Sequence, residues 1–192
     1  MFLTDSSSPE SASYLEAERA AVGYVMNCER VWAWRPDVAE DFGRLRQQLM
    51  KRSSLTAREI ALLTCTAVRV LGDSYCSLAW GTRLAAMRGA ADVVTLLQGE
   101  DPITSTPREV ALRKWAEQVV RDPNGASAKQ VDGLRAAGLS DQEIFEATVH
   151  IAFRLAFSAV NDALGALPDR EVMAAAPPEI VAAVTYGRLP NE

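Results

Sequence analysis

Apolar residues recur every three or four positions along most of the chain, which is the spacing of one face of an α-helix. The pattern predicts a series of helical segments. Their approximate ranges are 13–31, 37–51, 56–71, 74–88, 90–98, 107–121, 127–137, 141–164 and 178–186. No segment alternates apolar and polar residues between hairpin turns, as antiparallel strands do. The sequence therefore predicts an all-α fold.

Polar residues at the predicted helix starts support these boundaries. In a capping box, a Ser or Thr and a Glu or Gln three positions later each satisfy a backbone N–H of the first helical turn. The pattern occurs at Ser13/Glu16, Thr56/Glu59, Thr106/Glu109, Ser127/Gln130 and Ser140/Glu143. Glycines that are typical of helix ends follow several segments, at Gly89, Gly99, Gly138 and Gly165.

The segment 141–164 differs from the others because apolar residues cover most of its predicted surface. A helix of this kind is buried, either centrally or in a subunit interface. Residues 1–12 contain a Ser-Ser-Ser-Pro run and lack the features of a signal peptide, so we expect a flexible start. We expect residues 13–192 to form one helical domain.

Composition narrows the possible functions. The chain has 192 residues, a net charge of -5 and interspersed charges, so no basic stripe indicates a nucleic acid as partner. Its apolar stretches are interrupted by Arg69, Arg154 and Asp162, well before the roughly 18 uncharged residues of a membrane span. We expect a cytoplasmic protein with reduced thiols. His150 is the only histidine and the cysteines are widely spaced, so we expect no metal and no cofactor.

The most informative stretch is 55–89, LTAREIALLTCTAVRVLGDSYCSLAWGTRLAAMRG. It resembles the core motif of the alkylhydroperoxidase-D (AhpD) and carboxymuconolactone-decarboxylase superfamily. That motif runs Leu-x-x-Arg-Glu, an apolar helix, then a Cys-x-Tyr-Cys-like turn with a His four residues later. The resemblance extends over roughly residues 20–168, with further matching segments at 23–27, 34–36, 132–144 and 161–165. It implies an AhpD-like helical bundle that forms homo-oligomers, commonly trimers or dimers of trimers.

The peroxidatic branch of that superfamily uses a glutamate, a Cys-x-x-Cys pair and a histidine as a proton relay. By the resemblance, Cys76 occupies the position of the second cysteine, whereas Asp73 replaces the first. The histidine and glutamate positions hold Trp80 and Ala61. A disulfide between positions 73 and 76 is therefore impossible, and an indole N–H cannot shuttle a proton as imidazole does.

The chemistry of Cys76 depends on its neighbours. Asp73 is expected to be either the N-cap of the helix that follows or a catalytic carboxylate. A helix N-terminus lowers the pKa of a thiol and a nearby carboxylate raises it, so the sequence does not decide whether Cys76 is activated. Trp80 lies one turn after Cys76 and is expected to line a substrate pocket or to fill the space of the absent histidine.

Other residues were candidates for the same pocket. His150 is a core histidine or a second proton-transfer group that approaches Cys76 from another helix. Tyr75 is a packing residue whose hydroxyl is hydrogen-bonded, or a pocket residue beside the thiol. Cys65 is a core residue or the thiol that resolves an oxidised Cys76, and Cys28 is structural.

Three functions remain open on this basis. The first is a thiol-dependent peroxidase that reduces a small hydroperoxide with Cys76 alone, resolved by Cys65 or an external thiol. The second is a non-catalytic helical module that binds a small molecule or a partner. The third is a non-redox, decarboxylase-like enzyme that acts on a small lactone or carboxylate.

Overall fold

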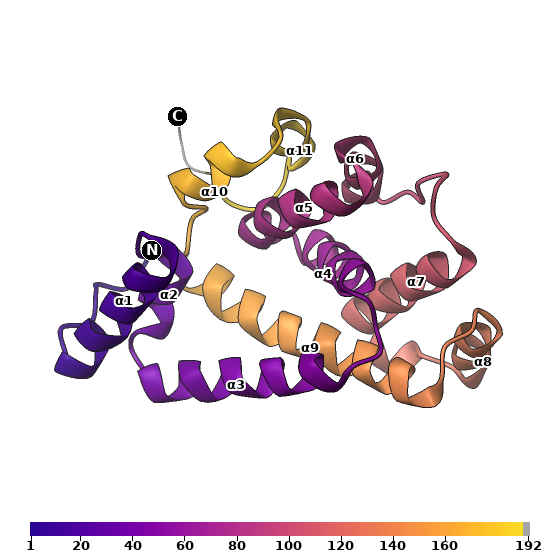
Figure 1. Ribbon diagram of the computed structural model, residues 1–192, viewed down its shortest axis with the longest axis horizontal. Coiled ribbons are helices and arrows are strands. Elements are labelled where there is room, and N and C mark those ends of the chain that lie inside the picture. The colour runs from indigo at the N-terminus through magenta and orange to yellow at the C-terminus, as the bar shows by residue number, and fades with distance from the viewer. Residues whose placement is uncertain (190–192) are drawn as a thin grey trace.

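The computed structural model describes residues 1–189, which form helices joined by loops and contain no strand (Figure 1). The helices are α1 (Pro9–Val22), α2 (Asn27–Trp32), α3 (Pro36–Arg52), α4 (Ala57–Leu71), α5 (Ser74–Arg88), α6 (Ala90–Gln98), α7 (Pro107–Arg121), α8 (Ala128–Ala136), α9 (Asp141–Ala163), α10 (Arg170–Ala175) and α11 (Pro178–Ala183), with a 3₁₀ turn at Pro123–Gly125. The all-α prediction is confirmed.

Four of the five predicted capping boxes are present, at Thr56, Thr106, Ser127 and Ser140. The box predicted at Ser13 is wrong, because α1 begins at Pro9 with Ser8 as its N-cap. The start predicted to be flexible thus contains the first turn of a helix. In that turn Ser11 is buried, and its hydroxyl donates a hydrogen bond to the carbonyl of Ala33.

The predicted helix 13–31 is two helices. The chain leaves α1 at Gly23, whose φ of 94° is in the left-handed region that favours glycine, and α2 begins at Asn27. Helix α10, of six residues, was not predicted. None of the helices in residues 1–189 combines the length and the apolar composition that a bilayer crossing needs.

Helix α4 lies at the centre of the bundle and packs against α5, α7 and α9, whereas α3 runs along the outer side of α9 (Figure 1). Every residue of α4 from Glu59 to Val68 is buried. The prediction that α9 is buried is correct for one face only. Ile144 and Ile151 belong to the core, but Phe145 on the opposite face is 65% exposed. The apolar residues of α9 therefore cover both a face buried in the core and a face exposed on the surface.

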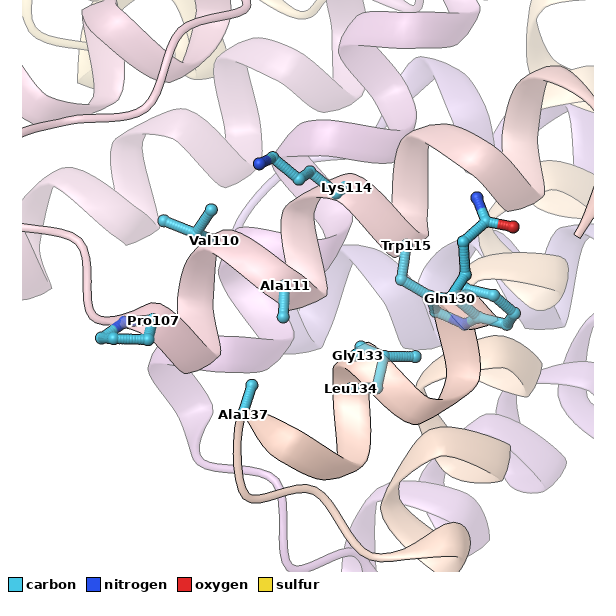
Figure 2. A pocket seen from close by; sticks show the side chains of 9 residues that line it. All are labelled: Pro107, Val110, Ala111, Lys114, Trp115, Gln130, Gly133, Leu134 and Ala137. Atoms are coloured by element: carbon cyan, nitrogen blue, oxygen red, sulfur yellow. The ribbon is translucent and has the colours of Figure 1, made fainter. Parts of the chain in front are cut away.

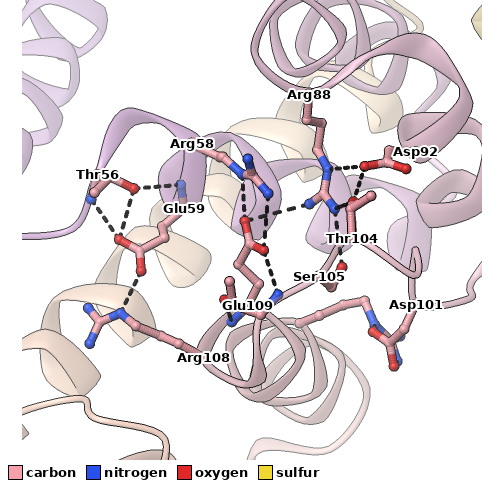
Figure 3. A network of polar contacts seen from close by, with 12 residues as sticks. Thr56, Arg58, Glu59, Arg88, Asp92, Asp101, Thr104, Ser105, Arg108 and Glu109 are labelled. Atoms are coloured by element: carbon pink, nitrogen blue, oxygen red, sulfur yellow. Dashed lines mark hydrogen bonds and ion pairs between the residues drawn. The ribbon is translucent and has the colours of Figure 1, made fainter.

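A cluster of ion pairs joins the helices around α4 (Figure 3). The Glu109 carboxylate of α7 accepts hydrogen bonds from Arg58 of α4, at 2.6 Å to Nε, and lies 3.7 Å from Nη1 of the buried Arg88 of α5. In parallel, Arg108 of α7 donates to Glu59 of α4 at 2.5 Å. Burial by itself raises the pKa of Glu109, but the hydrogen bond from Arg58 and the other positive charges outweigh it and hold the pKa below its usual value.

We expect Glu109→Gln to lower the free energy of unfolding by about 2 kcal/mol at pH 7, because it leaves two arginines without their shared carboxylate. A native carboxylate with a lowered pKa stabilises the fold above its unfolded pKa and loses this effect as the pH falls through the folded pKa. The difference between the variant and the wild type should therefore shrink in acid. Urea denaturation at neutral and acidic pH measures both effects. Glu100→Gln, at an exposed residue without an ion pair, is the control and should change the stability by less than about 0.5 kcal/mol.

Candidate functional site

The turn between α4 and α5 positions the residues that the sequence singled out. Helix α4 ends at Gly72, whose φ is 78°, and Asp73 follows as the N-cap of α5. One Asp73 oxygen accepts the backbone N–H of Cys76 at 2.8 Å, and the other accepts the hydroxyl of Ser158 from α9 at 2.5 Å. The N-cap interpretation of Asp73 is confirmed, and both of its oxygens have partners.

Cys76 lies in the first turn of α5 and is only 3% exposed. Nη1 of Arg154 on α9 lies 3.5 Å from its Sγ. Burial raises the pKa of the Cys76 thiol to about 12, and the Asp73 carboxylate adds to this rise, while Arg154 opposes it. The resting thiol is therefore protonated at neutral pH. The sequence showed the opposing charges of the helix terminus and Asp73, but not the burial that decides the direction.

Arg154 is a functional candidate that the sequence analysis did not identify. Its side chain is buried, pairs with no carboxylate among residues 1–189, and its Nε has no hydrogen-bond partner. The guanidinium lies 5.3 Å from the ring centroid of Trp80 and 5.2 Å from that of Phe157. Arginine is almost never fully buried without a partner, since desolvating its charge costs several kcal/mol. A charged residue within the otherwise apolar segment 151–157 was the available signal.

A cavity of about 250 Å³ lies beside this group, between α3, α4, α5 and α9. Its lining is Gly43, Arg46, Gln47, Leu49, Met50, Ile60, Trp80, His150 and Phe153. Trp80 and His150 thus both line this cavity, and their assignment to a substrate pocket stays a prediction. Arg154 connects the cavity to the thiol, because it contacts both the Trp80 ring and Sγ of Cys76.

His150 cannot act as a general acid at neutral pH. Its Nε2 lies 2.8 Å from the hydroxyl of Thr64, and its side chain is buried. Burial, together with the positive charges of Arg154 and Arg46, lowers its pKa to about 3. A neutral imidazole with one hydrogen-bonded nitrogen is consistent with the core interpretation of His150, although the ring also borders the cavity.

The charges around the cavity are mainly positive. The guanidinium of Arg46 lies 5.1 Å from the ring centroid of Phe157, and that of Arg83 lies 4.7 Å from that of Trp80. Neither arginine forms an ion pair within residues 1–189. Burial lowers the pKa of Arg46 to about 10, with a second contribution from Arg154. Three arginines without carboxylate partners therefore surround Trp80 and Phe157.

Two residues predicted to belong to the pocket do not line this cavity. Tyr75 precedes Cys76 on α5 and is rotated by about 100° from it, so its hydroxyl donates to Asp169 and lies 3.4 Å from Sγ of Cys28. Cys65 belongs to the main hydrophobic core, and burial raises its thiol pKa to about 12. Cys28 packs in a small buried cluster with Tyr75, Cys76 and Val68, in agreement with its interpretation as structural.

A second groove, of about 310 Å³, lies between α7 and α8 (Figure 2). Its walls are mostly apolar, with Trp115 and Leu134 at the base and Lys114 as the charged side chain at its rim. None of the candidate site residues lines it. Residues 1–189 also contain no group of three or more His, Cys, Asp or Glu side chains that could hold a metal ion.

Comparisons with known proteins place this geometry in a fold. No family model and no curated protein matches the sequence. Among solved structures, an uncharacterized peroxidase-related protein with an AhpD core from Ralstonia eutropha JMP134 is similar, with a TM-score of 0.75, 19% identity, and coverage of 86% of this chain and 88% of that one. A peroxidase-related protein from Silicibacter sp. TM1040 also has a TM-score of 0.75, with 20% identity and coverage of 88% and 90%.

The debrominase Bmp8 is similar as well, with a TM-score of 0.72 and 16% identity over 93% of this chain and 95% of that one. A cysteine-to-alanine variant of Bmp8 in complex with 2,3,4-tribromopyrrole has a TM-score of 0.70. These similarities extend over nearly the whole chain at identities that show the fold alone. Together with the α4–α5 turn that carries Cys76, they show that this chain has the AhpD-like fold.

Proposed function

We propose that this protein is a thiol-dependent oxidoreductase in which Cys76 reduces a small hydroperoxide. The observation that carries the proposal is the contact between Arg154 and Cys76, at 3.5 Å. Arg154 has no other anion beside it within residues 1–189, so a Cys76 thiolate would be its natural counter-charge. In this chain the arginine takes the place of the charged partner that activates a reactive cysteine.

The proposed step balances without a further group. Cys76 first loses its proton to give a thiolate, which attacks the distal oxygen of the hydroperoxide. An S–O bond forms, the O–O bond breaks, and the departing alkoxide takes up a proton equivalent to the one that the thiol released. The products are a sulfenic acid at Cys76 and an alcohol. An external thiol that attacks the sulfenic acid sulfur releases water and forms a mixed disulfide.

The similarity to Bmp8 supports the small-molecule part of the proposal. That fold accommodates a small aromatic ring in a variant that lacks a cysteine. In the present chain Trp80, Phe153 and Met50 provide apolar walls for the cavity near the Cys76 turn. The proposal therefore requires a small substrate and a slow reaction, because burial keeps the resting thiol protonated.

The rate of Cys76 oxidation by hydrogen peroxide should rise steeply with pH. Since only the thiolate reacts and the thiol pKa is raised to about 12, its fraction grows about tenfold per pH unit, or about 1,000-fold from pH 6 to pH 9. Mass spectrometry with a sulfenic-acid trap measures the rate at each pH. A rate that is independent of pH, or a label that remains in Cys76→Ser, would contradict the role of Cys76.

Removing the positive charge beside the thiol should slow this oxidation. We expect Arg154→Met to lower the rate about tenfold at every pH, because an opposite charge at this distance lowers a pKa by about one unit or more. The variant should remain folded, with a melting temperature at least equal to that of the wild type, since it removes a buried unpaired charge. Arg44→Met, at an exposed arginine paired with Asp41, is the control and should react like the wild type. An unchanged rate in a folded Arg154→Met would exclude thiolate stabilisation by Arg154.

The structure also changes the expectation for an internal resolving thiol. Cys28 shares a small buried cluster with Cys76, whereas Cys65 belongs to the main core. If a disulfide forms after stoichiometric peroxide treatment, non-reducing peptide mapping should therefore find Cys28 joined to Cys76. Attack by the Cys28 sulfur on the Cys76 sulfenic acid would release water. A Cys65–Cys76 linkage would show that the core rearranges instead.

A second function is favoured by the protonated thiol and the neutral His150. The cavity would then bind a small molecule without turnover. A decarboxylase-like reaction has less support, because no described group beside the cavity is poised to transfer a proton near neutral pH.

A further inference from the structure

We propose that the cavity beside Trp80 binds a small organic carboxylate. The carboxylate group pairs with Arg46, and the apolar part of the ligand contacts the apolar walls of the cavity. This inference rests on the proposed function and adds that the small hydroperoxide carries a carboxylate group, which binds in the cavity next to the turn of Cys76. It assigns a role to Arg46 and Arg83, which the thiol chemistry does not use.

The first argument is the arrangement of charge. Arg46 lines the cavity, and its side chain is half-buried without an ion pair in residues 1–189. The guanidinium groups of Arg46 and Arg154 lie 5.1 and 5.2 Å from the same Phe157 ring centroid, which places a second positive charge close by. Arg83 adds a third on the face of Trp80. Positive groups that repel one another in a partly buried site are stabilised by an anion bound between them.

The second argument is a difference between the two sides of Arg46. A second cavity, of about 470 Å³, also includes Arg46, and its other charged lining residues are one arginine, Arg44, and three glutamates, Glu18, Glu29 and Glu40. The cavity beside Trp80 has no carboxylate in its lining. An anion is therefore repelled on the first side and attracted on the second. This difference selects the Trp80 side as the binding site.

The third argument concerns the shape and polarity of the Trp80 side. Leu49, Met50, Ile60 and Phe153 form apolar walls around a volume of about 250 Å³, which suits a ring or a short alkyl chain. A planar guanidinium binds a carboxylate through two parallel hydrogen bonds. An inorganic anion would leave the apolar walls unused, so an organic carboxylate fits the whole site best.

Arg154 and Arg46 then have separate tasks. Arg154 contacts Sγ of Cys76, whereas Arg46 borders the space in which a ligand can lie. A carboxylate held by Arg46 leaves Arg154 as the counter-charge of the thiolate. The two roles can therefore be tested separately.

The test compares matched ligands by titration calorimetry, on the wild type and on Cys76→Ser. Benzoate and hexanoate are the carboxylates, benzamide and hexanamide their uncharged counterparts, and sulfate the inorganic anion. We expect both carboxylates to bind at millimolar concentration or tighter, and at least tenfold more tightly than the amides and sulfate. Binding to Cys76→Ser should equal that of the wild type, because the thiol is not the anchor.

Variants at Arg46 identify the anchor. Arg46→Met, which keeps the aliphatic contacts, should weaken benzoate binding at least tenfold, and Arg46→Lys should recover part of the loss. Arg44→Met, two positions away and exposed, should bind benzoate like the wild type. Equal binding of benzoate and benzamide, equal binding of sulfate, absence of carboxylate binding, or equal losses in Arg44→Met and Arg46→Met would each overturn the inference.

The outcome for binding is distinct from the outcome for the thiol chemistry. Benzoate binding to Cys76→Ser together with slow, pH-independent oxidation of the wild type would retain the carboxylate site and reject the oxidoreductase. Peroxide oxidation that depends on pH and Arg154, without benzoate binding, would retain the oxidoreductase and reject the carboxylate site.

Discussion

The carboxylate of Asp73 joins two helices at the centre of the candidate site. One oxygen accepts the backbone N–H of Cys76 and so begins α5, and the other accepts the hydroxyl of Ser158 on α9. The same side chain therefore holds the first turn of α5 against α9. Cys76 is itself one partner of Asp73, and Arg154 lies about one turn before the other partner, Ser158, so this contact brings the thiol and the guanidinium to the same place.

The position of Asp73 also influences the pKa of Cys76. Its negative charge and the burial of Sγ both raise the pKa of Cys76, and Arg154 alone among the groups in direct contact supplies an opposing positive charge. A buried guanidinium without a carboxylate lowers the stability of the fold. Arg154 is nevertheless present beside Cys76, where a thiolate would use its charge. Such a loss of stability is expected at a site where function and stability oppose each other. By contrast, Glu109 and Glu59 each form an ion pair with an arginine of the neighbouring helix, and these pairs hold α7 against α4.

The similar solved structures clarify what is retained and what has changed. At 16–20% identity the arrangement of helices is preserved over almost the whole chain. The resemblance assigned four catalytic positions, of which only Cys76 keeps its residue type. By that resemblance Trp80 corresponds to a proton-relay histidine, and in this chain its ring lines the cavity and contacts the guanidinium groups of Arg83 and Arg154. The AhpD-like fold of this chain thus places arginines and an indole where the motif implies a proton-relay histidine.

The sequence by itself determined most of the helices, their starts and the place of the turn that carries Cys76. Capping boxes, terminal glycines and apolar periods are local signals, since each depends on residues within a few positions of one another. Two local features were missed. Gly23 divides one predicted helix into α1 and α2, and the short helix α10 was not predicted.

Only the tertiary structure decided which side chains share an environment. Arg154 is 78 positions from Cys76, Cys28 is 48 positions from it, and Arg46 approaches the cavity from a separate helix. The burial of a group and the pairing of its charge depend on such distant neighbours. These two effects determine the pKa of a thiol and whether the lining of a pocket is positively or negatively charged. The sequence could therefore locate the cysteine, whereas its protonation and the charge of the adjoining cavity followed from the packing of α3, α5 and α9.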